Sequence, residues 1–403
     1  MKSLSIAMVA ACPFPANHGS PASIREMSQA LASLGHKVHV VTYPMSQDIP
    51  VEGITIHRAG KIFRSSKVTV GPTYYKPFLD LLLVIKLCSV IRKEKIDIIH
   101  AHNYEGALAG YIAKKITGKP MLYNAVNNMI DELPSYNFIR PKWLAIKLAN
   151  FLDNLVPKMG DYVTVVSEYL HNFLLKKGIP QGRMAVIPAG VNMGMFEGKA
   201  PDIIRKRYNI GSQPLVVYTG TLDMFQGIDY LIKAMRIVVD SINDAVLIVV
   251  GNIINPADIA RHKNLVREMG IDENVIFTDE RPLEEVPYFL ASADVAVVPR
   301  PSCPGFPVKL LNYMAAGKAI VTFEGSAKGL KNMYNAVTVK NDDWEGFGKG
   351  ILMIVKNPEL ARGLGRNAKA SINGAFDWST LAKKIEKIYQ KILKDSEGTG
   401  DEQ

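Results

Sequence analysis

Short apolar segments alternate with segments of helical periodicity along almost the whole chain, and this alternation limits the possible folds more than any other feature. In the first half, strand-like runs cover residues 5–11, 37–43, 96–102, 120–126, 161–167 and 184–190. The second half repeats the plan over 214–220, 245–251, 274–279, 294–300 and 319–323. Strands separated by helices favour right-handed βαβ units. The pattern predicts an α/β protein with two Rossmann-like, doubly wound parallel-sheet domains that face each other across a cleft.

A Gly-rich segment without periodicity, residues 192–202, separates the two halves and is the expected linker. A chain of 403 residues is also too long for one ordinary core. We therefore expect a first domain over 1–195 and a second over 200–375. A helix over 380–394 has apolar residues at helical spacing and is expected to dock on another element. The polar tail 395–403 is expected to be disordered.

The cysteines and the apolar segments exclude several classes of protein. The three widely spaced cysteines, Cys12, Cys88 and Cys303, argue for a reducing compartment rather than for disulfides or a zinc site. The first apolar run meets a proline too early for a signal peptide. The longest apolar stretch is interrupted by Asp80 and Lys86 and is too short to span a bilayer. We expect a cytoplasmic protein.

The net charge of +10 lies entirely in the first half, where residues 1–200 hold 23 Lys and Arg against 13 Asp and Glu. Such an excess favours a surface that faces phosphates, on a membrane or an anionic acceptor. Lysine-rich helix faces that keep a domain in solution explain it equally well. Nucleic acid is not an expected partner, because the cations are spread over helices. The segment 61–86 mixes cations with Tyr and apolar residues and could contact a membrane, although a half-buried helix explains it better.

The loops that follow strands are the expected ligand-binding segments, because doubly wound sheets bind ligands beyond the carboxyl ends of their strands. Gly19 and Ser20 follow the first strand, whereas Gly220 and Gly251 end strands of the second half. Each glycine lets the backbone approach a ligand, and each following helix offers free N–H groups to an anion. Taken singly, each loop is also an ordinary strand-to-helix turn.

The stretch PGFPVKLLNYMAAGKAIVTF, residues 304–323, has the strongest features of a binding site. Pro307 is expected at the start of a helix, where its fixed φ costs no hydrogen bond. Lys309 lies in the first helical turn and Arg300 leads into the loop, so the helix start is a predicted diphosphate site. Asn312 follows one turn later and could bond a sugar hydroxyl. The alternative is that Lys309 and Asn312 are only surface polar residues.

With these segments, the chain resembles the family-4 retaining glycosyltransferases of the GT-B fold over nearly its whole length. The resemblance is carried by ALASLGHKVHVVT, IDIIHAHN, DYVTVVSEYL, VIPAGVN, YTGTL, QGIDYLIKAM, ADVAVVPR and above all GFPVKLLNYMAAGKAIV. It implies a nucleotide-sugar donor on the second domain, an acceptor on the first, and a final helix that packs back on the first domain. It also implies that no metal or other cofactor is needed, because helix dipoles and basic side chains carry the diphosphate.

Two segments of the predicted donor site depart from the pattern of the family. Pro304 and Asn312 stand where the family usually has two glutamates, which leaves sugar contacts to the backbone N–H groups of Gly305 and Phe306. In the loop after the first strand of the second domain, Thr221 and Gln226 replace an Arg and a Lys. Lys309 and Arg300 would supply the missing charge.

The histidine positions differ as well. Val126 or Asn127, depending on the register, occupies the place of a His that is common in the family. We expect catalytic roles for Lys309, Arg300 and Asn127. His18 and His102 are expected on the acceptor side, whereas His100 lies within a strand and is expected in the core.

The resemblance implies a metal-independent hexosyltransferase that moves a sugar to a lipid-linked or polysaccharide acceptor in cell-envelope glycan synthesis, at the inner face of the membrane. The leaving phosphate can take the acceptor proton, so no strong base is needed. The alternative is a catalytically impaired relative that binds a nucleotide-sugar or partners an active subunit. Hydrolysis of a nucleotide-sugar by the purified protein would distinguish the two.

Overall fold

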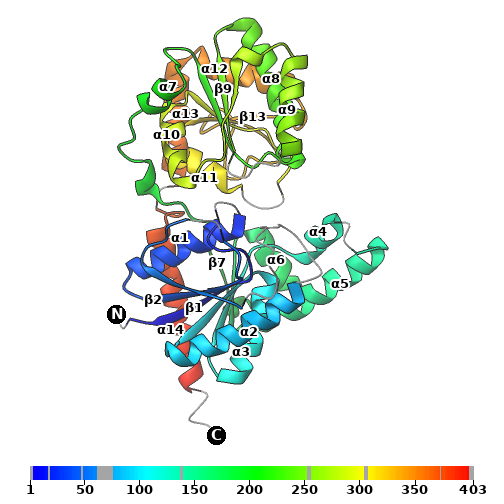
Figure 1. Ribbon diagram of the computed structural model, residues 1–403, viewed down its shortest axis with the longest axis vertical. Helices are drawn as coiled ribbons and strands as arrows, with labels where there is room; N and C mark the ends of the chain where they lie inside the picture. Colours follow the sequence, from blue (N-terminus) through cyan, green and yellow to red (C-terminus); the bar gives the residue numbers. More distant parts are fainter. Residues whose placement is uncertain are drawn as a thin grey trace. The chain divides into compact units, whose positions relative to one another are not determined.

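A computed structural model of the chain describes residues 3–16, 19–46, 49–60, 76–136, 139–251, 256–303, 307–372 and 374–398. The chain forms two compact units, one of Met1–Gly190 with Trp378–Gln403 and the other of Val191–Asp377 (Figure 1). Each unit is described by itself below. Within the described ranges, no helix combines the length and the apolar character that crossing a membrane requires.

The first unit contains a seven-stranded parallel sheet in the order β3-β2-β1-β4-β5-β6-β7. Its strands are β1 (Ser5–Ala10), β2 (Lys37–Thr42), β3 (Ile54–Arg58), β4 (Ile98–His102), β5 (Met121–Ala125), β6 (Tyr162–Val165) and β7 (Met184–Val186). Its helices are α1 (Gly19–Ser33), α2 (Lys76–Lys93), α3 (Asn103–Thr117), α4 (Met129–Glu132), α5 (Lys142–Leu155), α6 (Glu168–Lys176) and α14 (Trp378–Gly398), with 3₁₀ turns η1 (Leu133–Tyr136), η2 (Val156–Lys158) and η3 (Gln181–Arg183).

Residues of the central strands alternate between two apolar clusters, one on each face of this sheet. In β1, Ala7 and Val9 pack in a cluster with residues of α2 and α3. Ile6, Met8 and Ala10 pack in the other cluster, with residues of α1 and α14. Because side chains alternate between faces with a period of two, a strand that is covered on both sides is apolar at every position.

The final helix α14 belongs to the first unit, although it follows the whole second unit in sequence. The Trp378 indole N–H donates to Glu26 of α1 at 2.9 Å and anchors the start of the helix. The helix continues to Gly398, so residues 395–398 are helical rather than disordered as expected, and residues 399–403 lie outside the described part. Its apolar residues, buried beside α1 and the sheet, include Leu381, Ile385, Ile388 and Ile392.

The second unit contains a six-stranded parallel sheet in the order β10-β9-β8-β11-β12-β13. Its strands are β8 (Leu215–Gly220), β9 (Val246–Gly251), β10 (Val275–Phe277), β11 (Val295–Val298), β12 (Ala319–Phe323) and β13 (Val337–Val339). Its helices are α7 (Asp202–Arg207), α8 (Ile228–Ser241), α9 (Pro256–Glu268), α10 (Val286–Ser292), α11 (Val308–Ala315), α12 (Trp344–Val355) and α13 (Pro358–Ser371), with 3₁₀ turns η4 (Met193–Phe196), η5 (Met224–Gln226), η6 (Asp272–Asn274) and η7 (Leu283–Glu285).

The strand orders define one switch point in each sheet, where successive crossovers proceed in opposite directions along the sheet. In the first unit the switch lies between β1 and β4, and in the second between β8 and β11. The loops beyond the carboxyl ends of these paired strands are the places where doubly wound sheets bind ligands. They lead to Gly19 and Ser20 in the first unit, and contain Thr221 and Arg300 in the second.

Candidate active site

The loops that follow β8 and β11 touch each other at the switch point of the second sheet. Gly227 closes the first of these loops with a φ of +73°, which residues with a side chain rarely adopt. A Cβ atom on Gly227 would lie 2.1 Å from the carbonyl oxygen of Pro299 and 3.3 Å from the ring of Pro301. The absence of a side chain therefore permits the close contact that joins the two loops.

Lys309 projects from the first turn of α11 into this pair of loops. Its ammonium Nζ donates to the Tyr218 hydroxyl at 2.7 Å and to Gln226 Oε1 at 2.9 Å. The Gln226 amide donates to Thr221 Oγ1 at 3.2 Å, and the Tyr218 hydroxyl donates to the Thr221 carbonyl at 2.6 Å. Gly220 leaves room for the ammonium, since a Cβ there would lie 2.7 Å from Nζ. Residues predicted separately from the loop and from the helix thus meet at one cation.

The positive charge of Lys309 is poorly neutralised by its surroundings. Burial and then the neighbouring charge of Arg300 lower its pKa to about 7, partly opposed by Asp223. Among the residues that the structure describes, no carboxylate lies at ion-pair distance from Nζ. An ammonium has three N–H donors, and two of them are used by neutral oxygen atoms. One donor and an unbalanced charge remain for an anion.

Arg300 is positioned by the same two loops. Its Nε donates to the carbonyl of Ser302 at 2.7 Å, and its guanidinium lies 4.8 Å from the centre of the Phe225 ring. Phe225 belongs to η5 in the loop after β8. This cation–π contact connects the loops a second time and places a second positive charge near Lys309.

The amino end of α11 lies beside these cations. Pro307 occupies the cap position, one residue before the helix, and offers no side-chain hydrogen bond to the first-turn N–H groups. Asn312 is half-buried one turn further along, and its bond to a ribose hydroxyl stays a prediction. Three other predicted donor-site residues, Pro304, Gly305 and Phe306, lie outside the described residues.

The edge of the sheet next to Gly220 carries a cation that sequence reasoning missed. Gly251 at the end of β9 pairs with Gly220, and its carbonyl accepts a hydrogen bond from the Arg281 backbone N–H at 2.9 Å. The Nε atom of Arg281 is buried and has no hydrogen-bond partner in the described part of the chain. The position of Arg281, shortly after a predicted strand, was the signal that could have identified it.

A buried histidine supports the loop after β8. His262 of α9 is fully buried, and its Nε2 lies 3.0 Å from the carbonyl oxygen of Leu222. Its Nδ1 lies 2.9 Å from Asp229 Oδ1, which is close enough for an ion pair although the geometry is not that of a hydrogen bond. His262 therefore positions the loop that contains Thr221 and Gln226.

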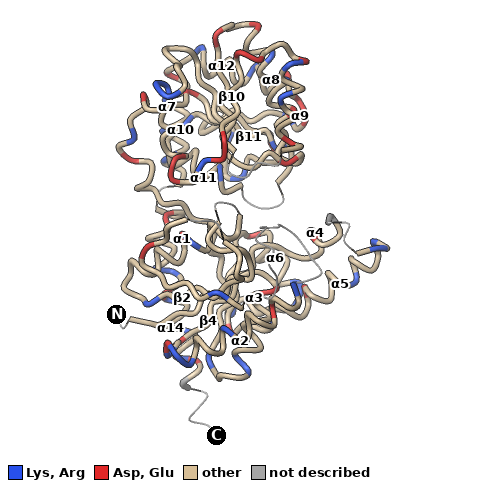
Figure 2. Tube along the Cα trace, in the orientation of Figure 1, with Lys and Arg blue, Asp and Glu red and all other residues tan. Residues whose placement is uncertain are grey.

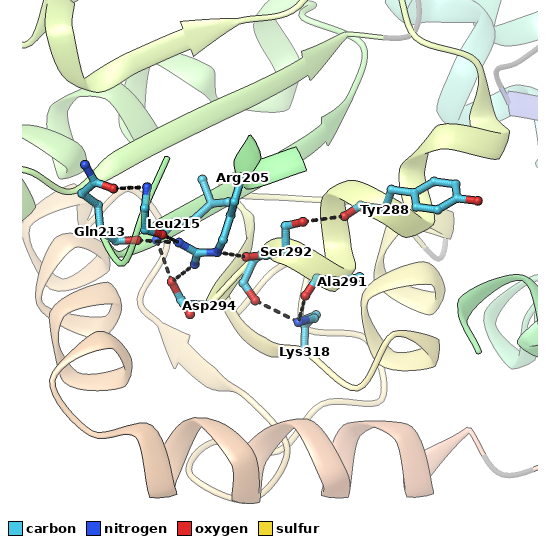
Figure 3. A network of polar contacts seen from close by, with 10 residues as sticks. Arg205, Gln213, Leu215, Tyr288, Ala291, Ser292, Asp294 and Lys318 are labelled. Atoms are coloured by element: carbon cyan, nitrogen blue, oxygen red, sulfur yellow. Dashed lines mark hydrogen bonds and ion pairs between the residues drawn. The ribbon is translucent and has the colours of Figure 1, made fainter. Parts of the chain in front are cut away.

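A second cationic cluster, shown in Figure 3, lies at the opposite ends of the strands. Arg205 donates to Asp294 at 2.8 Å, and Lys318 donates to the carbonyls of Ala291 and Ala293, both at 2.9 Å. Burial lowers the pKa of Lys318 to about 8. Because Asp294 directly precedes β11 and Lys318 directly precedes β12, this network ties together the amino ends of the strands and is structural.

In the first unit, the switch point brings together Ser20 and Asn103. The Ser20 hydroxyl lies 3.5 Å from Asn103 Oδ1, and Asn103 has a φ of +60°, which is unusual for a residue with a side chain. Gly19 begins α1 with a φ of +46°. His18, the neighbouring residue that we expected on the acceptor side, lies outside the described residues.

His102 differs from the acceptor-side role that we expected of it. It is 1% exposed, its Nδ1 lies 3.2 Å from the Asn124 amide nitrogen, and burial lowers its pKa to about 3. Its ring stacks on that of His100, whose Nδ1 lies 2.6 Å from the Tyr389 hydroxyl of α14. His102 does end a strand, but packing encloses it as a neutral core residue, as it does His100.

The loop after β5, which contains Asn127, is held by a carboxylate that sequence reasoning also missed. Asp153 of α5 is fully buried. It accepts hydrogen bonds from the backbone N–H groups of Met129 at 2.8 Å and Ile130 at 3.0 Å, and from the Tyr104 hydroxyl. Asn127 is half-buried, and its Oδ1 has no hydrogen-bond partner among the described residues. A catalytic role for Asn127 stays a prediction.

Comparison with known proteins assigns the chain to one enzyme family. Residues 201–371 match the model of glycosyl transferases group 1, and residues 18–194 match that of glycosyltransferase family 4. N-acetyl-alpha-D-glucosaminyl L-malate synthase of Bacillus anthracis is 22% identical over 95% of this chain and 96% of its own length. N,N'-diacetylbacillosaminyl-diphospho-undecaprenol alpha-1,3-N-acetylgalactosaminyltransferase of Campylobacter jejuni is 22% identical over 79% of this chain and 83% of its own length.

The solved structure of HepE from Anabaena, in complex with UDP and glucose, has the same fold. It matches with a TM-score of 0.73 and 16% sequence identity, over 96% of this chain and 99% of HepE. The two parallel-sheet α/β units described above are the two domains of the GT-B fold. The chain belongs to the family-4 glycosyltransferases of the GT-B fold, with a group 1 glycosyl transferase domain in its second half.

Proposed function

We propose that this protein is a retaining, metal-independent hexosyltransferase that moves a sugar from a nucleotide-diphosphate sugar to a lipid-linked or polysaccharide acceptor in cell-envelope glycan synthesis. The observation that carries the proposal is the Lys309 ammonium, which Tyr218 and Gln226 fix beside the amino end of α11. A diphosphate suits a fixed cation next to free helix N–H groups, because both attract negative charge and both donate hydrogen bonds.

The chemistry asked of these residues is the stabilisation of a leaving group. As the bond between the sugar C1 and the diphosphate oxygen breaks, negative charge grows on the diphosphate, and the acceptor hydroxyl forms the new C1–O bond on the same face. The hydroxyl proton passes to the departing phosphate. Lys309, Arg300 and the first-turn N–H groups of α11 would stabilise the growing charge.

The names of similar proteins support the classes of donor and acceptor. HepE was solved with UDP and glucose, and the Campylobacter jejuni transferase is named for a diphospho-undecaprenol acceptor. The excess of Lys and Arg in residues 1–200 suits an acceptor that carries phosphates or lies at an anionic membrane. We therefore propose that the protein acts in the cytoplasm, at the inner face of the cell membrane.

A second candidate function is that of a catalytically impaired relative, which binds the donor or partners an active subunit. It is favoured by Pro304 and Asn312, which replace the usual glutamates, and by Val126 or Asn127 at the position of the usual His. A neutral amide is a weaker partner for a ribose hydroxyl than a carboxylate.

The test is a panel of UDP-, GDP- and ADP-sugars with the purified protein, read by thermal shift and by release of free nucleotide. The proposal expects one donor to raise the melting temperature and to release its nucleotide by hydrolysis or by transfer to a polyprenyl-diphosphate acceptor. Lys309→Ala is expected to abolish the thermal shift. Binding without turnover across all donors and acceptors would favour the second candidate, whereas an undiminished shift in Lys309→Ala would move the diphosphate site elsewhere.

A further inference from the structure

Helix α5 of the first unit presents its large apolar side chains to solvent and its small ones to the protein. The residues that it buries are Ala145, Ala149 and Asp153. Surface helices of globular domains normally have the opposite arrangement. The exposed large residues are Trp143 (57% exposed), Leu144 (43%), Ile146 (39%), Leu148 (38%), Phe151 (59%) and Leu155 (40%). We call this set the α5 face; within it, residues 144, 148, 151 and 155 form a continuous stripe at helical spacing.

Within the chain segment that contains α5, the exposed charged side chains are all cationic, although the adjacent helix α4 carries the exposed acid Asp131. Between residues 139 and 160 they are Arg140, Lys142, Lys147 and Lys158, and the single acid of this segment, Asp153, is buried. Within α5 itself, the cations lie in the first half of the helix (Figure 2). The Lys147 ammonium lies 5.0 Å from the centre of the exposed Trp143 ring, so cationic and aromatic side chains lie next to one another at the edge of the stripe.

The α5 face is connected to the carboxyl edge of the first sheet. The buried Asp153 carboxylate accepts hydrogen bonds from the backbone N–H groups of Met129 and Ile130, and thereby holds the loop that contains Asn127. In Figure 1, α4 and α5 lie together and α5 extends away from the sheet. Whatever binds the α5 face is therefore held close to the loop after β5.

We propose that the α5 face docks in the interfacial region of a bilayer that contains anionic lipid. A helix with aromatic and aliphatic residues on one face and cations beside them binds such an interface through buried apolar area and electrostatic attraction. A second copy of this chain is a poorer occupant. In a two-fold interface the same patch meets itself, which would bring the cations of one copy against those of the other.

This inference rests on the proposed function. It names the surface through which a lipid-linked acceptor would reach the enzyme. The segment 61–86, which the sequence suggested as a membrane contact, is the alternative surface in the same unit. Its residues 61–75 lie outside the described part, and the rest belongs to α2, which exposes Phe78, Leu81 and Ile85.

The test is flotation of the full-length protein with phosphatidylcholine vesicles that either contain or lack phosphatidylglycerol, in the absence of any nucleotide-sugar. We expect binding to the anionic vesicles, weakened by salt. The double variant Phe151→Ser/Leu155→Ser is expected to lower the vesicle partition coefficient by about tenfold or more, since each side chain loses its apolar burial. The double variant Lys142→Glu/Lys147→Glu is expected to lower the vesicle partition coefficient by at least about fivefold for each substituted position. The matched control, Tyr334→Ser, alters a side chain of the second unit that is 53% exposed and should change nothing.

Trp143 supplies a second readout that does not depend on folding yield. It is 57% exposed, whereas Trp378 is 4% exposed and the third tryptophan, Trp344, is half-buried in the second unit. A blue shift of the tryptophan emission on adding vesicles is therefore expected in the wild type and absent in Trp143→Phe. The proposal would be overturned if the folded wild type did not float, or if the α5 variants floated as well as the wild type. It would also be overturned if Leu81→Ser in α2, rather than the α5 variants, lost binding, or if the protein were a dimer in solution that Phe151→Ser dissociates. Since no donor is present, failure of vesicle binding is distinguishable from failure of the proposed transfer reaction.

Discussion

Replacing Lys309 with methionine is expected to change how the affinity for a nucleotide-sugar depends on pH. In the free protein, burial and the charge of Arg300 lower the pKa of Lys309 from its ordinary value of 10.5 to about 7. A bound diphosphate would raise that pKa again, so binding above pH 7 takes up a proton. The affinity should therefore be constant where the ammonium is already charged, below a pH of about 7, and should fall as the pH rises above it.

The magnitude follows from the size of the shift. As long as the pKa of the bound state stays above the solution pH, each pH unit above 7 costs about 1.4 kcal/mol of binding free energy, or about a factor of ten in Kd. The Kd of the wild type should thus rise about a hundredfold over two pH units. Lys309→Met has no titrating group and should show no such slope. At neutral pH it should also bind about ten- to a hundredfold more weakly, because a hydrogen bond from a charged group is lost.

The assay is isothermal titration calorimetry over a pH range of about 6 to 9, with whichever of UDP-, GDP- or ADP-glucose binds. The diphosphate of these donors has no group that titrates in this range, and a uracil or guanine N–H begins to titrate only at its upper end. Lys318→Met is the matched control. Lys318 is also a buried lysine, with a pKa lowered to about 8, but it lies at the opposite ends of the strands. It should keep the wild-type slope. A wild type without a slope, or a Lys309→Met variant that keeps one, would refute the reasoning.

Three further substitutions test the architecture of the site. Gly227→Ala forces a Cβ against the loop after β11 at a positive φ and should destabilise the protein by about 2–4 kcal/mol in urea unfolding, whereas Gly198→Ala, with φ +65° and open space around it, should cost about 1 kcal/mol. Gly220→Ala should displace the Lys309 ammonium, which would lie 2.7 Å from the new Cβ. The loss of binding free energy for the nucleotide-sugar, measured by calorimetry, should exceed the loss of unfolding free energy. Asp153→Ala leaves two backbone N–H groups unpaired and should cost about 2–4 kcal/mol of unfolding free energy, with donor affinity unchanged; an unchanged stability would contradict the role of this carboxylate.

The central strands of both sheets could be predicted from sequence because they are buried on both faces and are therefore continuously apolar. Edge strands do not have this property. In β3, Ile54–Arg58, no residue is fully buried, and β13, Val337–Val339, is only three residues long. Both were missed, since half-buried or very short strands resemble loops in composition. Helix α5 was missed for a related reason: its large apolar residues face solvent, so its pattern is not that of a core helix.

The candidate site could be predicted in its parts but not in its contacts. The helix residue Lys309 was recognised from its local pattern, and the loop residues Thr221 and Gln226 from the resemblance to the family. The hydrogen bond between Lys309 and Gln226 joins positions 83 residues apart, which only the folded sheet brings together. Asp153 was missed because a single acid in an apolar-rich segment has no sequence signal that tells burial from exposure, whereas the only signal for Arg281 was its position shortly after a predicted strand. The same limit explains His102, whose position at a strand end was correct but whose enclosure depends on neighbouring strands.

The most direct test of the central claim is the structure of the protein in complex with the nucleotide-sugar that it binds. The diphosphate is expected within hydrogen-bond distance of Lys309 Nζ and of the first-turn N–H groups of α11, between the loops after β8 and β11. A diphosphate bound at any other part of the chain, with Lys309 still bonded only to Tyr218 and Gln226, would contradict the claim.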